Sequence, residues 1–529
     1  MSEQLVVAPM LVVLVTAVLT LGLREWPNAQ IAASVAGVLG YAASVGVLAW
    51  RFVLAPGAPG AMAYQVAGWP APFGITLVAD GLSAFMLSMI AVVSVASLVF
   101  STRYVGPADQ RAFYYPFFFF LLLGVTGAFL TGDLFNLFVW FEVLLMSSYV
   151  FVAFVGEARH TRAALRYVVM NFIASSVMLV AIGGLYATTG TLNMADMSRR
   201  LANPEAFGVH VEPVVGLSVL LLVVFALKAG LVPFQFWVPS AYQAAPFPVT
   251  AMLAGATKKV GIYAIIRLYF TVLASAELSI SLPLPGVAGN SPLAFLGPLL
   301  LLMGAASILL GGYGALSADT IEGVLAYSSI GQAGFIAIPV AIAAVAPTPA
   351  LQQLAILAAL VYALNHALSK GLLFLAAAAV RHATGTSRLA DLGGLAGRTP
   401  VLSGAVFVGL LSLVGIPPLS GFFGKLLVFR TVAGTDAFAL VAVLAGSILT
   451  IAYTTRAWSQ GIWGSASPAV EHATTDAVQV AVLVGLAALI VAVGVGFEPV
   501  YQFADAAATA AVDRGAYVDA VDPVGGGIE

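Results

Sequence analysis

The chain has no cysteine among its 529 residues. It therefore forms no disulfide and holds no zinc or iron–sulfur centre ligated by its own thiolates. Charged residues make up only 8% of the chain, about a third of the ~25% typical of soluble domains. The net charge of −2 gives no basic surplus, so we expect no binding to nucleic acid. These absences favour a membrane protein.

Hydrophobic residues, in contrast, make up 61% of the chain. A spanning helix needs about 20 apolar residues, so this length with short loops accommodates about fourteen spans. We predict an all-α polytopic membrane protein with a first span near the N-terminus rather than a cleaved signal, because MSEQLVVAPMLVV lacks a positively charged leader. The predicted spans are 4–23, 29–54, 80–101, 112–131, 133–155, 165–188, 212–232, 246–272, 292–313, 321–343, 350–379, 399–430, 437–460 and 475–498.

The segments between the spans are short, with three longer exceptions. Residues 55–79 form a Gly/Pro-rich loop, 189–211 a loop with a short surface helix, and 380–398 a connection between the eleventh and twelfth spans. The tail, 500–529, is acidic and is expected to be interfacial or disordered.

The arginines of the loops predict the orientation. Alternate sides of the membrane receive ten and six arginines, and the side with more is expected to be cytoplasmic. We therefore predict a multi-pass protein of the cell membrane with both termini outside. The ten are Arg24, Arg103, Arg111, Arg159, Arg162, Arg166, Arg381, Arg388, Arg398 and Arg456, and the six are Arg51, Arg199, Arg200, Arg267, Arg430 and Arg514.

All five lysines lie inside apolar stretches instead of loops. A lysine at the centre of a membrane helix costs roughly 2.5–3.5 kcal/mol, so each is a candidate functional residue. The five are Lys228, Lys258, Lys259, Lys370 and Lys425.

Two spans carry a proline break near a lysine. The seventh has Pro233 after Lys228, and the twelfth has Pro417 and Pro418 before Lys425. Proline frees backbone carbonyls, which the membrane tolerates only where protein or water satisfies them. Paired broken helices indicate inverted repeats with an ion site at the breaks, although the order of lysine and proline differs between the two. We divide the chain into helices 1–3 (1–111), a first five-helix repeat (112–272), a second (292–460), and helix 14 with the acidic tail (461–529).

Glu142 is the only carboxylate deep within a predicted span. It follows Asp133, at the start of that span, by nine residues, or roughly 13–14 Å, which is near mid-bilayer. A carboxylate paired with a buried amine forms a charge-coupled proton site. Lys228 is its expected partner. The alternative interpretation is that Glu142 is simply a residue near the end of its helix.

The remaining lysines lie near polar side chains that could relay protons. Lys258 and Lys259 point about 100° apart, so we expect one in the pathway and the other supporting it, or a pair near a helix end. His366 and Lys370 share a helix face and suit a proton relay, the alternative being a core histidine. The alternative for Lys425 is snorkelling to an interface. Possible supporting residues are Ser328, Gln332 and Asn365.

These residues also carry a resemblance to a known family. The stretches TGDLFNLFVWFE, LKAGLVPFQFW, GATKKVGIYAIIR, GVLAYSSIGQAGFI, LNHALSKGLLFL and GIPPLSGFFGKLLVFR resemble the antiporter-like subunits of respiratory complex I and of Mrp-type Na+/H+ antiporters. The resemblance implies fourteen helices with two inverted five-helix repeats. It also implies, for proton translocation, the residues Glu142, Lys228, Lys259 (with Tyr263 four residues on), His366, Lys370 and Lys425.

Within this family the chain most resembles the D-type subunits of Mrp antiporters. One complex I subunit has glutamate at the position of Lys425, and the longest members carry C-terminal extensions that this chain lacks. One departure is Glu322, where relatives usually have a basic residue.

The leading hypothesis is a subunit of a secondary cation/proton antiporter rather than an enzyme. Protons would move along the lysines, Glu142 would tune Lys228, and proton influx would drive Na+ export. The expected partners are other antiporter subunits, protons, Na+ and the lipid bilayer, with no cofactor and no metal site. A second hypothesis is a proton-pumping subunit of complex I or a membrane-bound hydrogenase, and a third is a structural scaffold.

Overall fold

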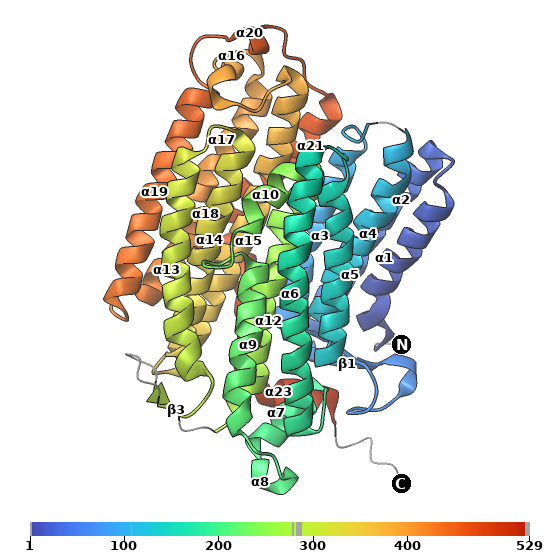
Figure 1. Ribbon diagram of the computed structural model, residues 1–529, viewed down its shortest axis with the longest axis vertical. Coiled ribbons are helices and arrows are strands. Elements are labelled where there is room, and N and C mark those ends of the chain that lie inside the picture. The colour runs from blue at the N-terminus through green and yellow to red at the C-terminus, as the bar shows by residue number, and fades with distance from the viewer. Residues whose placement is uncertain (1–2, 107, 278–279, 282–287, 524–529) are drawn as a thin grey trace.

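The computed structural model is a bundle of long helices. It describes residues 3–106, 108–277, 280–281 and 288–523. In Figure 1 the helices run roughly parallel to the long axis, with α1 and α2 at one edge of the bundle and α13 and α19 at the opposite edge.

Thirteen stretches of the described residues are long and apolar enough to cross a membrane. They are α1 (Gln4–Gly22), α2 (Pro27–Ala49) with η1 (Trp50–Leu54), α3 (Gly81–Ser101), α4 (Ala108–Leu130), α5 (Leu134–Ala153), α6 (Ala158–Thr189), α9 (Glu212–Ala229), the composite span Phe247–Ser275, α13 (Leu293–Ser317), α14 (Ile321–Ala344), α15 (Pro349–Thr384), α19 (Ala437–Gly461) and α21 (Ala477–Val495).

The twelfth predicted span, 399–430, is present as two shorter helices, α17 (Pro400–Val414) and α18 (Ser420–Val432), which completes fourteen spans. The prediction of an all-α membrane protein with about fourteen spans is therefore confirmed. The sixth helix begins at Ala158 instead of residue 165. Its first turns carry arginines, which lower hydropathy without breaking a helix.

The connections contain short elements. They include a β-hairpin in the predicted loop 55–79 and, in the predicted loop 189–211, α7 (Met194–Ala202) and α8 (Pro204–Phe207). The hairpin pairs β1 (Ala61–Gln65) with β2 (Thr76–Asp80), in the register Ala61↔Asp80. The other short elements are η2 (Val66–Gly68), α10 (Trp237–Ala244), β3 (Ile280–Ser281), β4 (Ala288–Gly289), η6 (Leu389–Asp391), α16 (Leu395–Arg398) and α20 (Pro468–Glu471).

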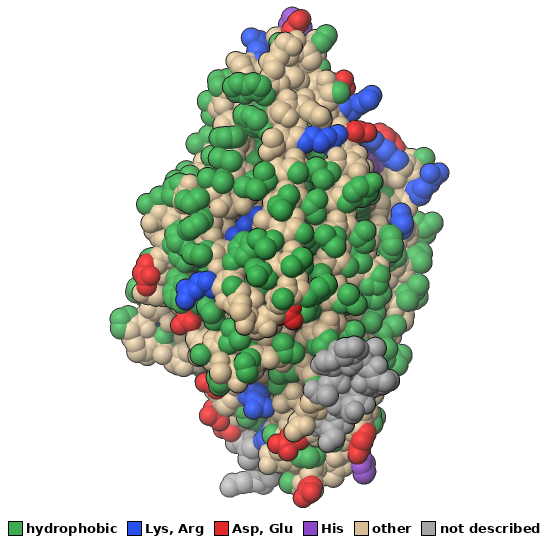
Figure 2. All heavy atoms as spheres, turned by 90° about the vertical axis from the view of Figure 1, so that its left-hand side faces the viewer, with side chains coloured by type: hydrophobic (Ala, Val, Ile, Leu, Met, Phe, Trp, Pro, Cys, Tyr) green, Lys and Arg blue, Asp and Glu red, His purple; other side chains and the backbone are tan. Residues whose placement is uncertain are grey.

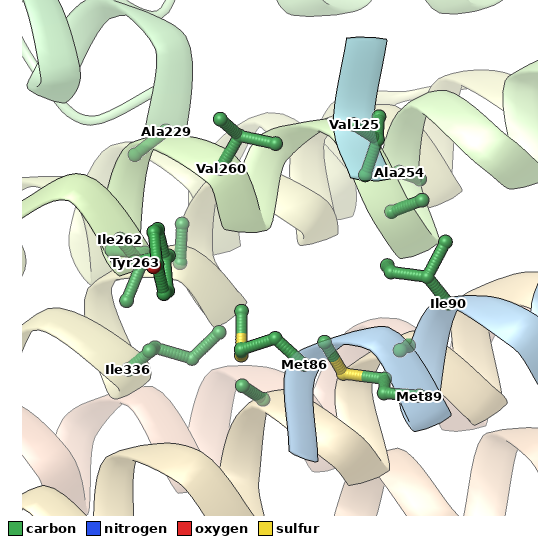
Figure 3. Packing of buried hydrophobic residues seen from close by; sticks show 14 of the residues in the cluster. Met86, Met89, Ile90, Val125, Ala229, Ala254, Val260, Ile262, Tyr263 and Ile336 are labelled. Carbon is green, nitrogen blue, oxygen red and sulfur yellow. The ribbon is translucent and has the colours of Figure 1, made fainter. Parts of the chain in front are cut away.

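The composite span Phe247–Ser275 lies at the centre of the bundle and is buried along almost its whole length. It consists of α11 (Phe247–Met252), η3 (Leu253–Thr257), α12 (Lys258–Ile266), η4 (Arg267–Val272) and η5 (Leu273–Ser275), in which η3 and η4 are π-helical. Figure 3 shows Met86 of α3 together with Val260 and Tyr263 of α12 among the buried residues of one hydrophobic cluster. Because protein surrounds this span, its charged side chains do not face lipid.

The described part of the C-terminal tail, residues 500–523, packs as part of the bundle. It forms α22 (Phe497–Val512) and α23 (Arg514–Val521), so the expectation of disorder is wrong for these residues. The α22 helix buries an alanine face (Ala504, Ala507, Ala508 and Ala511) and packs against α3, where the rings of Phe503 and Phe85 are 5.3 Å apart. Small side chains permit this close approach. The spacing of the alanines indicates a packed helix, but the acidic composition of the tail drew attention away from it.

The outer surface is apolar along the middle of the bundle. Figure 2 shows hydrophobic side chains over much of the middle of one face, with charged side chains more frequent above and below. Large apolar side chains such as Val15, Phe172 and Ile448 are more than 60% exposed. Such exposure suits contact with lipid.

One buried ion pair joins the central span to the beginning of α3. The guanidinium of Arg267 lies 2.6 Å from the carboxylate of Asp80, and both side chains are buried. Asp80 also caps α3 through the backbone N–H of Ser83. The ring of Tyr517 lies 4.8 Å from the guanidinium carbon, which connects α23 to the pair. Arg267, counted above among the loop arginines, is thus inside the protein.

Replacing Arg267 with methionine is expected to destabilise the protein by roughly 3–5 kcal/mol, because the Asp80 carboxylate is left buried without its partner. Thermal unfolding of the detergent-solubilised protein measures the loss. Arg456→Met is the matched control, because Arg456 pairs at 3.4 Å with Asp319, which is 84% exposed. An exposed pair contributes about 0–1 kcal/mol. Equal effects of the two substitutions would contradict the prediction.

Candidate functional site

Both predicted helix breaks are present. The first separates α9 from α10 at residues 230–236, and the second separates α17 from α18 at residues 415–419. Each begins with a left-handed glycine, Gly230 (φ 68°) and Gly415 (φ 90°), a conformation that favours glycine. Pro233 lies in the first break, and Pro417 and Pro418 lie in the second.

Neighbouring side chains satisfy the backbone groups at the breaks. The Trp237 indole donates to the carbonyl of Leu227 at 2.8 Å, and the N–H of Val232 donates to the Ser307 hydroxyl at 2.9 Å. At the second break the Asn365 amide donates to the carbonyl of Ser412 at 3.4 Å. The breaks are therefore held by other helices, as a membrane interior requires.

The two lysines at the breaks have buried amines without a hydrogen-bond partner. Lys228 is 1% exposed in the last turn of α9, and Lys425 is 6% exposed in α18. Neither Nζ has a hydrogen-bond partner among the described residues. The Lys425 Nζ lies 5.2 Å from the centre of the Phe335 ring. Both amines are therefore buried without an acceptor among the described residues.

The other three lysines are hydrogen-bonded in the interior. Lys258 Nζ donates to the carbonyl of Ser329 at 3.0 Å. Lys370 Nζ donates to the carbonyl of Leu325 at 3.0 Å and to the Ser328 hydroxyl at 2.5 Å. All three contacts cross from one span to another, so they are interhelical links.

Lys259 and His366 are in direct contact. Lys259 Nζ lies 2.5 Å from His366 Nδ1 and donates to the carbonyl of Ala254 at 2.7 Å. Ala254 lies in the π-helical turn η3, and π-turns are frequent at functional sites. A hydrogen bond between two nitrogens needs one donor and one acceptor, so the two nitrogens do not both present an N–H group to each other.

Lys258 is closer to the first break than the sequence indicates. A β-carbon at position 230 would lie 3.1 Å from Lys258 Nζ, which places this amine against the left-handed Gly230. The sequence predicts Lys258 as a supporting residue. Its amine lies between the first break and α14, while Lys259 reaches α15.

Two groups of buried polar side chains lie near the lysines, one of them at the second break. The Asn365 side-chain oxygen accepts hydrogen bonds from Ser412 (2.7 Å) and Ser420 (2.9 Å), on either side of that break. The Gln332 amide donates to the Tyr453 hydroxyl at 3.0 Å, and its oxygen accepts from Tyr362. The supporting residues Ser328, Gln332 and Asn365 thus all take part in buried hydrogen bonds. Tyr362, Ser412, Ser420 and Tyr453 were missed, because a hydroxyl in an apolar span carries no distinctive local signal.

Glu142 and Lys228 do not form a direct ion pair. No carboxylate lies within 4 Å of Lys228 among the described residues, although the Glu142 charge is near enough to interact with it. Glu142 is half-buried and accepts a hydrogen bond from the Ser175 hydroxyl of α6. The carboxylate is therefore held by α6. Ser175 was not predicted, since it is an ordinary serine in a membrane helix.

No group of three or more His, Cys, Asp and Glu side chains that could hold a metal occurs in the part of the chain that the structure describes. The chemistry available at this site is proton exchange between amines, an imidazole, hydroxyls and one carboxylate.

Comparison with known proteins places this chain in a family. Residues 131–450 match the family described as NADH:quinone oxidoreductase/Mrp antiporter, transmembrane. The chain is 36% identical over 459 residues to the D-type subunit of the Na(+)/H(+) antiporter of Alkalihalophilus pseudofirmus, covering 86% of this chain and 87% of the relative.

Two solved structures have the same fold. A chain of the Mrp complex from Dietzia sp. DQ12-45-1b superimposes with a TM-score of 0.83 at 27% identity, covering 98% of this chain and 99% of that one. A chain of the membrane-bound sulfane sulfur reductase, an archaeal respiratory membrane complex, gives 0.86 at 28% identity, covering 98% and 100%.

Proposed function

The chain belongs to the NADH:quinone oxidoreductase/Mrp antiporter transmembrane family, and we propose that it is the D-type subunit of a multi-subunit Na+/H+ antiporter. Its part is to provide a proton route through buried Lys, His and Glu side chains. The observation that carries this proposal is the pair of unpartnered lysines, Lys228 and Lys425, at two helix breaks connected by a polar interior. A purely structural scaffold has no use for two buried amines without partners.

The proton route runs in the plane of the membrane from one break to the other. Its order is Lys228, Lys258, the Lys259–His366 pair, Lys370 with Ser328, the Asn365 and Gln332 network, and Lys425. A proton on one amine repels a proton on the next, and two unit charges 4 Å apart interact by about 4 kcal/mol at an effective dielectric of 20. Loading one end of the row therefore favours release at the other.

Glu142 acts at the Lys228 end of the route. Its charge is near enough to stabilise a proton on Lys228 without forming a direct ion pair that would hold it there. Ser175 positions the carboxylate from α6. Glu142 thus sets how readily Lys228 is loaded.

The two halves of the route correspond to two inverted five-helix repeats, residues 112–272 and 292–460. Each half has one broken helix with a lysine at or near the break. In both halves the broken helix packs on the third helix of its repeat: α9 and α10 pack on α6, and α17 and α18 on α15. These parallels support the repeat assignment.

The subunit works with partners in the cell membrane. The relative from Alkalihalophilus pseudofirmus is named as a subunit of an Na(+)/H(+) antiporter, and the Dietzia structure is of a complex. Other subunits of the same complex, protons, Na+ and the lipid bilayer are therefore the partners of this chain. The arginine-rich end of the bundle is cytoplasmic, and both termini face outward.

Antiport in vesicles tests this function. The complete operon is expressed in cells that lack Na+/H+ antiporters, and everted vesicles are given a pH gradient. Adding Na+ is expected to dissipate the gradient in proportion to the amount of complex. Vesicles without the operon are the control, and no response to Na+ or any other monovalent cation would refute the proposal.

The similarity to the sulfane sulfur reductase complex favours a second candidate, a proton-pumping subunit of a redox-driven membrane complex. The same vesicles distinguish the two. A redox pump forms a pH gradient when an electron donor such as NADH is added and does not respond to Na+, whereas an antiporter consumes an existing gradient without a donor.

A further inference from the structure

We propose that a pocket lined by arginines beside the start of α6 binds the phosphate headgroup of an anionic phospholipid. The pocket has a volume of about 280 Å³ and lies between the start of α6, α10, the start of α14 and the end of α15. Its charged lining is Arg159, Arg162, Arg166 and Arg381 with one carboxylate, Glu322.

Most of the positive charge of this pocket has no ion-pair partner among the described residues. Arg162, Arg166 and Arg381 have no ion-pair partner within 4 Å among the described residues. Arg159 pairs with Glu157 at 2.9 Å. The three arginines without an ion-pair partner and one glutamate line the pocket, which leaves a surplus of two positive charges (3 − 1). A surplus of this kind attracts an anion.

The position of the arginines on α6 strengthens this inference. The helix begins at Ala158, and Arg159, Arg162 and Arg166 lie in its first three turns. The N-terminus of a helix carries a partial positive charge, so cations there are unfavourable and anions are favourable. An anion bound between these arginines and the helix terminus relieves both repulsions.

Glu322 does not neutralise the arginines. One of its carboxylate oxygens accepts a hydrogen bond from the Ser387 hydroxyl at 2.8 Å, and the other has no partner and is buried. The pocket also has a neutral group that can donate hydrogen bonds to a phosphate, the Gln243 amide, whereas the Ser240 hydroxyl in its lining already donates to the carbonyl of Trp237 at 3.1 Å. Both lie on α10, which follows the first helix break.

The surface next to the pocket identifies the anion as a lipid. The α6 helix has 32 residues, or roughly 48 Å, whereas the hydrocarbon core is about 30 Å thick, so its ends extend into the headgroup region. Beyond the arginines the exposed side chains of α6 become apolar: Val169, Phe172 and Ile173 are 49%, 69% and 60% exposed. A headgroup at Arg166 would place its acyl chains along this face. Basic pockets between membrane helices bind anionic headgroups in this way.

Lipid binding to the assembled complex tests the proposal without reference to antiport. The complex is reconstituted in phosphatidylcholine vesicles that contain a small fraction of spin-labelled phosphatidylglycerol, and the immobilised fraction of the label is measured. We expect the Arg162→Gln/Arg166→Gln complex to bind phosphatidylglycerol roughly tenfold to thirtyfold more weakly than wild type. Arg398→Gln is the matched control, because it removes an exposed arginine of α16 outside this pocket and is expected to change nothing.

Three outcomes would overturn the proposal. The first is equal binding of phosphatidylglycerol by wild type and the double variant. The second is displacement of the labelled lipid from wild type by millimolar inorganic phosphate, which would identify a site for free phosphate. The third is protection of Arg162 and Arg166 from an arginine-modifying reagent by a neighbouring subunit in lipid-free complex, which would identify a protein contact. If the double variant does not assemble, the single Arg166→Gln variant takes its place, with a threefold or greater loss expected.

Discussion

Replacing Lys228 with methionine is expected to abolish Na+-dependent proton movement while the complex remains assembled. Lys228 is buried, and its amine has no hydrogen-bond partner, so the substitution breaks no hydrogen bond. Methionine keeps most of the apolar volume of the lysine chain. The loss is therefore of the proton carrier alone. We expect antiport to fall about a hundredfold or more, the range lost when a positioned proton-transfer group is removed.

The same substitution at Lys425 is expected to have a similar effect, because a row that works in series fails wherever one carrier is missing. The measurement is Na+-dependent dissipation of a pH gradient in everted vesicles, normalised to the amount of assembled complex. Leu227→Met is the matched control, since it places the same side chain next to Lys228 in the same buried turn of α9. Unchanged antiport in both lysine variants, with normal assembly, would refute the proton route.

A second large effect is expected from Gly421→Ala, at the second helix break. A β-carbon at this position would lie 1.7 Å from the carbonyl oxygen of Ser412 and 3.0 Å from the Asn365 amide nitrogen. The first contact is with backbone, which cannot move aside by rotating a side chain. The substitution must displace α17 from α18 and with them the Asn365 network. We expect a loss of several kcal/mol, as for severe overpacking of a core, and loss of antiport.

Gly404→Ala provides the control for this prediction. Gly404 lies within α17, and a β-carbon there would meet nothing within 4 Å. Alanine is favoured over glycine in a helix by about 1 kcal/mol, so this variant is expected to be as stable as wild type or slightly more stable. Thermal unfolding of the solubilised complex compares the two. Wild-type stability and activity of the Gly421→Ala complex would contradict the prediction, because they would mean that a β-carbon fits beside the Ser412 carbonyl.

The sequence by itself determined the class of the protein, its spans and its candidate residues. A membrane span is recognised from the hydropathy of about 20 consecutive residues, so the spans can be predicted without knowledge of the fold. The breaks could also be predicted, because proline acts on its own turn. The residues that stand out by charge in an apolar stretch, such as Lys228 and Lys425, needed no knowledge of the fold.

Only the tertiary structure decided which partner each of these residues has. Lys259 contacts His366, which is 107 residues away, and Lys258 contacts Ser329, which is 71 residues away. Glu142 is held by Ser175 instead of Lys228, and the acidic tail is a packed helix because its alanines fit α3. Each of these results depends on which faces of distant helices meet. Neighbours in the sequence do not contain that information, since the helices are separate until the bundle packs.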